Sequence, residues 1–226
     1  MRKLVDTLVA GKRRRTDVAP KTAQRVVKIV SWNLLHRSGA VVDDIAELIE
    51  EEDPDLFLMQ EATASIDALP SLAQGHYARQ PWPGRRHGLA AWCRRQLQGF
   101  GPLQLPASRM PGRFPPRFAQ LLKMDEITFA NVHLSHGQVL NRLQLREISR
   151  STEGPTAIIG DYNTLGPIKL RHFSDVGPRG STHHAQEIVP FRLDRCMVRD
   201  LHRVSAKALR RGRSDHRPIV IELCVV

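Results

Sequence analysis

Short apolar segments recur along this chain, separated by stretches that contain Gly, Pro and Arg. Their β-branched and aliphatic residues predict strands at 26–30, 55–60, 88–93, 103–105, 118–124, 127–132, 156–159, 192–198 and 216–225. Apolar residues at helical spacing predict helices at 41–52 and 138–150, whereas residues 164–190 are expected to be mostly loop. Many short strands with few helices indicate a layered α+β sandwich, in which functional groups lie on loops at the strand ends.

The first 25 residues differ in composition from the rest of the chain. A short apolar stretch is followed there by Lys12-Arg13-Arg14-Arg15, which predicts a basic N-terminal extension (residues 1–25) rather than a secretory signal. Residues 26–226 contain no internal repeat and no low-complexity linker, so we expect one domain, and we expect it to be monomeric. The sequence has no apolar run of the roughly 18 residues that a membrane-spanning helix needs.

Cysteine usage bears on the compartment in which the protein works. Cys93, Cys196 and Cys224 are widely spaced and form no C-x-x-C pair. This pattern argues against a thiolate zinc site and against a disulfide framework. The expected location is therefore a reducing compartment, the cytoplasm.

The chain is strongly basic, with a net charge of +11 and a pI near 10.4. An excess of this size predicts a polyanionic partner, either nucleic acid or an anionic membrane surface, although a merely solvated basic surface has the same composition. Arg85, Arg86 and Arg113 are interleaved with Trp82 and Phe114, a mixture that suits a phosphate backbone or lipid headgroups. These three arginines are the candidate substrate-binding residues.

Carboxylates and amides stand at the ends of several predicted strands. They are Asn33, Glu61, Asp161, Asn163 and Asp215. Any one of them alone is explained as a turn residue, but their recurrence together with His133 and His216 indicates a shared site. Oxygen ligands of this kind suit Mg²⁺, with Mn²⁺ as the alternative, and a neighbouring histidine can hydrogen-bond a phosphoryl oxygen. The set fits the hydrolysis of a phosphate ester.

Six short blocks carry a resemblance to a known family. They are Ser31-Trp32-Asn33, Gln60-Glu61, Val132-His133-Leu134-Ser135, Gly160-Asp161-Tyr162-Asn163, Leu193-Asp194 and Ser214-Asp215-His216-Arg217-Pro218. In this order they resemble the endonuclease/exonuclease/phosphatase superfamily, which includes deoxyribonucleases, apurinic endonucleases, neutral sphingomyelinases and inositol polyphosphate phosphatases. The resemblance implies the deoxyribonuclease I-like fold, a four-layered α/β/β/α sandwich of two packed, mainly antiparallel sheets.

The resemblance also implies roles for the polar residues at the strand ends. Glu61 matches the principal metal ligand, and Asn33 and Asp215 would complete the metal surroundings directly or through water. Asp161 matches the carboxylate that orients or deprotonates the attacking water. Asn163 would hold that water or a phosphoryl oxygen.

Two histidines and one further aspartate complete the implied site. His216 matches the histidine that contacts the scissile phosphate, and Asp194 would orient its ring and raise its pKa. His133 matches a second phosphate-contacting histidine of the deoxyribonuclease and sphingomyelinase branches. Apurinic endonucleases have a tyrosine there, so incision at abasic sites is not the expected activity.

The function implied is a divalent-metal-dependent phosphodiesterase acting on nucleic acid. A sphingomyelinase-like phospholipid phosphodiesterase, or another phosphatase of the superfamily, is the alternative within enzymes. A binding module that keeps the fold without activity is the third reading, and the intact set of acids and histidines argues against it. Two further expectations concern single residues: Trp32 belongs to the core, and the adjacent His183 and His184 are loop residues rather than a metal-binding pair.

Overall fold

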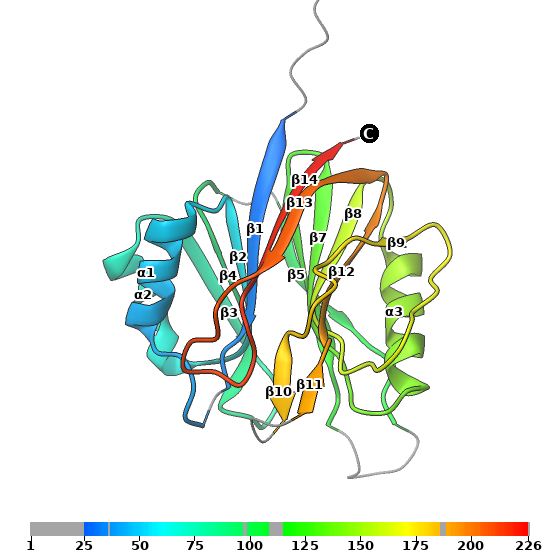
Figure 1. The fold of residues 1–226 in the computed structure, drawn as a ribbon, viewed down its shortest axis with the longest axis horizontal. Helices are drawn as coiled ribbons and strands as arrows, with labels where there is room; N and C mark the ends of the chain where they lie inside the picture. Colours follow the sequence, from blue (N-terminus) through cyan, green and yellow to red (C-terminus); the bar gives the residue numbers. More distant parts are fainter. Residues whose placement is uncertain (1–24, 36, 97–98, 109–114, 186–188, 226) are drawn as a thin grey trace, which may run out of the picture.

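The computed structural model describes residues 25–35, 37–96, 99–108, 115–185 and 189–225. Two six-stranded sheets face each other, with helices on both outer sides (Figure 1). The first sheet has the order β13-β14-β1-β2-β4-β3, and the second has the order β5-β6-β7-β8-β12-β9. The predicted four-layered sandwich is therefore confirmed. The extension predicted at 1–25 lies outside the described residues except for Arg25, so that division of the chain stays a prediction.

The strands of the first sheet are β1 (Val26–Asn33), β2 (Leu56–Thr63), β3 (His76–Pro81), β4 (His87–Cys93), β13 (Leu201–Ala208) and β14 (Ile219–Val225). Those of the second are β5 (Gly99–Gln104), β6 (Phe118–Met124), β7 (Ile127–His133), β8 (Thr156–Asp161), β9 (Ser174–Asp175) and β12 (Asp194–Arg199). A separate hairpin joins β10 (His183–Ala185) to β11 (Val189–Phe191). The helical segments are α1 (Val42–Glu52), the 3-10 turn η1 (Ala64–Ala68), α2 (Leu69–Leu72) and α3 (Leu140–Ser151).

Each sheet contains one parallel strand pair near its centre, and all its other pairs are antiparallel. The parallel pairs are β1 with β2 and β7 with β8. Parallel neighbours need a long crossover, and here α1 joins β1 to β2 while α3 joins β7 to β8. Because parallel strands end at the same edge, Asn33 comes to lie beside Gln60 and His133 beside Asp161. This pairing brings polar strand ends together.

Side-chain alternation along the strands divides the core into layers. In β2, Leu56 and Leu58 face the apolar layer between the sheets, whereas Phe57 and Met59 pack toward α1 and α2. A third layer lies between the second sheet and α3 and includes Leu145, Ile148 and Ile158. Trp32 is buried in the layer under α1, as expected for a core residue.

Several elements depart from the sequence-based expectations. Residues 164–190 are mostly loop, as expected, but they contain the short strands β9 and β10 and the start of β11, and strands β3 and β13 were not predicted. β13 escapes prediction because it is an edge strand whose central residues are exposed and do not alternate in polarity. The last strand begins at Ile219 rather than at residue 216, because Pro218 has no N–H to donate to a ladder.

Among the described residues, no helix is both long and apolar enough to cross a bilayer.

Candidate active site

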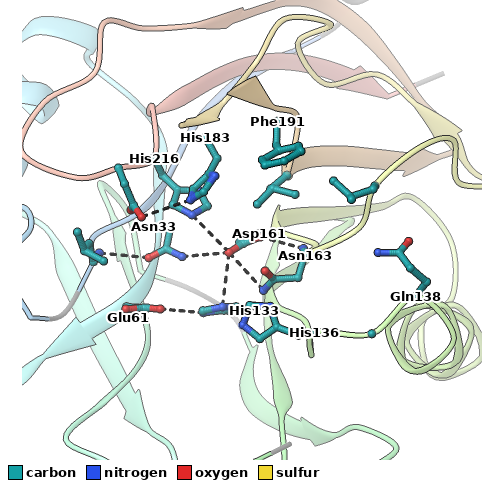
Figure 2. A pocket seen from close by; sticks show the side chains of 15 residues that line it. Asn33, Glu61, His133, His136, Gln138, Asp161, Asn163, His183, Phe191 and His216 are labelled. Carbon is teal, nitrogen blue, oxygen red and sulfur yellow. Dashed lines mark hydrogen bonds and ion pairs between the residues drawn. The ribbon is translucent and has the colours of Figure 1, made fainter. Parts of the chain in front are cut away.

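A cavity of about 440 Å³ opens where the two parallel strand pairs end. Ten of the fifteen residues that line it have polar or charged side chains, and they point toward one another (Figure 2). Seven of the predicted site residues line it, namely Asn33, Glu61, His133, Asp161, Asn163, Asp215 and His216. The eighth, Asp194, lies behind His216 and contacts its ring. The structure therefore brings together all the predicted catalytic and metal-binding residues, whose individual roles stay predictions.

Asp161 stands at the centre of this group and is only 2% exposed. Its Oδ2 accepts a hydrogen bond from Asn33 Nδ2 at 3.1 Å and lies 3.5 Å from His133 Nε2 and 3.8 Å from His216 Nε2. Burial raises the pKa of Asp161 above its ordinary value, although the charge of His216 opposes this shift. A carboxylate whose proton affinity is raised is suited to accept a proton from water.

The two amide hydrogens of Asn163 are already committed. Its Nδ2 donates to the carbonyl of Leu134 at 2.9 Å and to Asp161 Oδ2 at 3.4 Å. Its backbone N–H also donates to Asp161 Oδ1 at 2.9 Å. Since a primary amide has two N–H donors, Asn163 in this arrangement can reach a water only through its oxygen. Of the two contacts expected for Asn163, the geometry favours the water over the phosphoryl oxygen.

His216 is held by a buried carboxylate. Its Nδ1 lies 2.8 Å from Asp194 Oδ2, and Asp194 and His216 are 1% and 5% exposed. Burial alone would lower the pKa of His216, but the carboxylates of Asp194 and Asp161 outweigh it and raise that pKa to about 10. The ring is therefore an imidazolium at neutral pH, with Nε2–H directed toward the cavity.

His133 is buried in a different electrostatic environment. Burial holds its pKa well below the ordinary value, and the charges of Arg117 and His216 add to this effect. Its ring lies 5.2 Å from that of Trp82, and the Arg117 guanidinium lies 3.9 Å from the same Trp82 ring. His133 is therefore neutral, and it can offer the site a hydrogen-bond donor without a full charge.

The oxygen donors for a metal ion come from three separate segments. Glu61 sits in a β-bulge of β2 with φ of 59°, a backbone region that non-glycine residues rarely occupy. This bulge turns the Glu61 carboxylate into the cavity beside Asn33 (Figure 2). Asp215 lines the same cavity, and its pKa is lowered because a hydrogen bond from His183 and the charge of His216 outweigh the effect of burial.

This donor set fits a hard divalent cation. Two carboxylates and one amide oxygen match the ligand preference of Mg²⁺ and Mn²⁺. The cavity also gathers more carboxylates than cations. Glu61, Asp161 and Asp215 face it. Of its two histidines whose pKa is shifted, only His216 carries a positive charge at neutral pH. A bound cation would offset this excess of negative charge.

The arginines predicted to bind substrate are not part of the cavity lining. Arg85 and Arg86 lie in the exposed turn between β3 and β4, and Arg113 lies outside the described residues. Trp82, at the start of this turn, contacts the ring of His133, so the turn flanks the site rather than forming it. Binding of substrate by Arg85 and Arg86 stays a prediction.

His183 is the residue that the sequence reasoning missed. It was expected to be a loop residue, but it lies in β10, lines the cavity and places Nε2 at 3.3 Å from Asp215 Oδ2. Its ring stacks against Phe191 of the paired strand at 6.4 Å. No alternation of polar and apolar residues marks His183-His184-Ala185 as a strand, so the sequence offered no clear signal for a hairpin at the site.

Comparisons with known proteins agree with this geometry. The family model of the Endonuclease/Exonuclease/phosphatase family matches residues 30–216. An endonuclease/exonuclease/phosphatase from Bacteroides vulgatus has a similar structure, with a TM-score of 0.75 and 17% identity over 90% of this chain and 100% of that one. No curated protein gives a significant match to the chain.

Two further solved structures show the range of proteins with this fold. A mannosyl-6-phosphatase from Bacteroides thetaiotaomicron has a TM-score of 0.68 and 18% identity, over 87% of this chain and 99% of that one. TDP2 from C. elegans has a TM-score of 0.66 and 18% identity, over 88% of this chain and 75% of that one. Because the family model covers most of the chain and its blocks converge on one cavity, this protein belongs to the endonuclease/exonuclease/phosphatase family, whose members hydrolyse phosphoester bonds and generally use divalent metal ions.

Proposed function

We propose that this protein is a Mg²⁺-dependent phosphodiesterase that hydrolyses nucleic acid. The observation that carries the proposal is the arrangement of a buried imidazolium, His216, opposite a buried carboxylate, Asp161, with 3.8 Å between their nearest atoms. Hydrolysis of a phosphodiester needs a positive donor for the phosphoryl oxygens and a base for the attacking water. The two residues offer these opposite functions within one cavity.

Glu61, Asn33 and Asp215 would hold the metal ion, which we take to be Mg²⁺ with Mn²⁺ as a substitute. When bound, the ion supplies electrostatic stabilisation for the negative charge that develops on the phosphoryl group. Asn33 has a second function, because its Nδ2 donates to Asp161 while its Oδ1 accepts the backbone N–H of Leu35. The amide is thereby fixed in one orientation between the metal-binding and the base-bearing parts of the site.

His216 donates a hydrogen bond from Nε2 to a non-bridging oxygen of the phosphate. Asp194 keeps the ring charged and oriented, so no rearrangement is needed when negative charge develops in the transition state. His133, neutral and buried, offers a second hydrogen bond to the same group. Asp161 orients the water and accepts its proton, with Asn33 and Asn163 holding the carboxylate in place.

The choice of nucleic acid over other phosphodiesters rests on charge. The net charge of +11 favours a polyanion, and the exposed Arg85 and Arg86 flank the site through the turn that begins at Trp82. A phospholipid surface has the same sign of charge, so it is the alternative substrate. We further propose that the protein acts as a monomer in the cytoplasm, in line with three cysteines that are all free and buried.

Two assays test the proposal. The first measures Mg²⁺-dependent hydrolysis of bis-(p-nitrophenyl) phosphate by the wild type and by His216→Ala, with His202→Ala on the exposed strand β13 as the matched control. We expect activity in the wild type and the control, and a loss of about 10²-fold or more in His216→Ala. Absence of turnover in the wild type would favour a binding module instead.

The second assay compares plasmid DNA, RNA and anionic phospholipid vesicles as substrates at one fixed salt concentration. We expect cleavage of nucleic acid that weakens steeply as salt is raised, because phosphate contacts release counterions. Cleavage of vesicles alone would replace the nucleic-acid proposal with the phospholipid one.

A further inference from the structure

A second group of metal-ligand side chains lies at the rim of the cavity, on the side of the β10–β11 hairpin (Figure 2). His183, Asp215 and His216 each offer one ligand atom, and these three atoms lie within 4.8 Å of one another. The ring centroids of His183 and His216 are 4.4 Å apart. Two of the three ligands are imidazoles, which distinguishes this group from the oxygen donors Glu61 and Asn33.

The distances within this group suit a tetrahedral cation. Zn²⁺ binds imidazole nitrogen and carboxylate oxygen at about 2.0–2.2 Å, so two ligands of one tetrahedron lie roughly 3.4 Å apart. His183 Nε2 and Asp215 Oδ2 are separated by 3.3 Å, which matches one edge of such a site. The ligand atom of His216 lies no more than 4.8 Å from the other two ligand atoms. To reach the tetrahedral spacing it would have to move toward them by at most roughly 1.4 Å.

Backbone contacts hold His183 in this position. His183 forms a β-bridge with His216, and the backbone N–H of Arg217 donates to the carbonyl of Thr182 at 2.7 Å. The Thr182 hydroxyl oxygen in turn accepts the backbone N–H groups of Leu193 and Asp194, at 3.1 and 2.9 Å. The hairpin is thus tied to the segments that carry Asp194 and His216. Backbone contacts, and not the side chain of His183 alone, hold the ligand geometry in place.

The ring of His216 already has the environment of a metal ligand. Metal-bound histidines almost always place their second ring nitrogen against a carboxylate or carbonyl, which fixes the ring and raises its basicity. His216 Nδ1 meets Asp194 Oδ2 at 2.8 Å, so Nε2 is the nitrogen left for a ligand. His183 lacks such a partner, because its Nδ1 is buried without a hydrogen bond among the described residues, but its Nε2 faces Asp215.

We propose that His183, Asp215 and His216 form a second cation site, which is selective for an imidazole-binding transition metal such as Zn²⁺ and shares Asp215 with the Mg²⁺ site. Imidazole ligands favour Zn²⁺, whereas Mg²⁺ prefers oxygen and dehydrates reluctantly. Zn²⁺ bound there would displace the proton of His216 Nε2 to solvent and occupy the nitrogen assigned to the substrate phosphate. Zn²⁺ is therefore an inhibitor of the hydrolysis, a consequence that rests on the proposed function, whereas the binding itself does not.

Calorimetric titration of the untagged full chain with ZnCl₂, without Mg²⁺ so that Asp215 is not already occupied, tests the site directly. The variants are wild type, His183→Ala, and His202→Ala as a control histidine on the exposed face of β13. We expect the wild type and His202→Ala to bind one Zn²⁺ that His183→Ala binds at least tenfold more weakly. Titration with Co²⁺ should show the visible absorption of a tetrahedral site in the first two proteins and its loss in the third.

Unchanged Zn²⁺ affinity in His183→Ala, or no Zn²⁺ binding by the wild type, would overturn the site. His183→Phe, which keeps a ring against Phe191, replaces His183→Ala if the alanine variant fails to fold. Calorimetry needs no turnover, so the two proposals fail separately. Mg²⁺-dependent hydrolysis without Zn²⁺ binding refutes this inference alone, whereas Zn²⁺ binding without hydrolysis of any phosphodiester refutes the proposed function alone.

Discussion

The carboxylate of Asp194 lies 2.8 Å from Nδ1 of His216, and both side chains are almost completely buried. The pair is formed by the first residue of β12 and a residue just before β14, which belong to different sheets. A charged ring in such a position persists only if its partner is kept.

Asp194→Asn removes the charge that stabilises the imidazolium while keeping the shape of the side chain. The pKa of His216 is raised in the folded protein, so its charge persists well above neutral pH and is lost only as the pH rises through the raised value. Without Asp194 that loss should occur at lower pH. We expect kcat to fall by about 10²-fold near neutral pH, and the alkaline limb of the pH–rate profile to move toward acid.

The profile of Asp200→Asn should coincide with that of the wild type. Asp200 is exposed at the far end of β12 and has φ of 54°, a conformation that asparagine tolerates. If the alkaline limb of the pH–rate profile were at the same pH in Asp194→Asn and in the wild type, Asp194 would not be what keeps His216 charged.

Glu61→Gln should act through metal affinity. Gln keeps the length of the side chain but loses the charge that holds the cation. We expect Mg²⁺ to raise the melting temperature of the wild type, by the equivalent of about 2.7 kcal/mol at 100 times its Kd, and to have much less effect on the variant. Thermal unfolding in EDTA and in increasing Mg²⁺ measures this. An equal rise in both proteins would exclude Glu61 as a principal ligand.

Asp161→Asn should lower kcat and leave KM nearly unchanged. The amide cannot accept a proton from water, and its NH₂ group cannot accept the hydrogen bonds that Asn33 and Asn163 now donate. We expect a loss of about 10³-fold in kcat with bis-(p-nitrophenyl) phosphate. A parallel rise in KM with unchanged kcat would mean that Asp161 binds substrate rather than acting on water.

Asp175 should stabilise the fold in a pH-dependent way. Burial would raise its pKa, but hydrogen bonds from Arg192 at 2.6 and 2.7 Å and the charge of Arg195 lower it. A lowered pKa means that the stabilisation is complete above the unfolded value of about 3.9 and is lost as the pH falls through the folded value. Because Asp175 is an exposed residue, solvent screens these interactions, and Asp175→Asn should cost about 1 kcal/mol at pH 7.

Urea denaturation between pH 2 and 7 checks this, since the free energy of unfolding of the variant should depend less on pH in the acid range. Asp200→Asn again provides the exposed control. A constant difference between Asp175→Asn and wild type across the whole range would show that shape, and not charge, is what Asp175 contributes.

Much of the site was predictable because its residues stand at the ends of strands with clear patterns. Asp161 follows an apolar run and Glu61 follows another, so both positions can be read from the sequence. The left-handed backbone conformation of Glu61 could not be predicted, because the residues Gln60-Glu61-Ala62 contain no sequence signal for a β-bulge. The bulge depends on pairing with β4, which is remote in the chain.

The sequence alone determined most of the local elements and the identity of the candidate site residues, since periodicity and residue chemistry are local properties of the chain. Only the tertiary structure decided which groups meet: it placed His183 beside Asp215, Asp194 behind His216, and Arg85 and Arg86 outside the cavity. These contacts depend on sheet order and register, which arise from pairing between strands far apart in sequence. The candidate site residues could therefore be predicted from the sequence, but the hairpin that lines the cavity beside them, and with it the proposed second cation site, is a property of the fold.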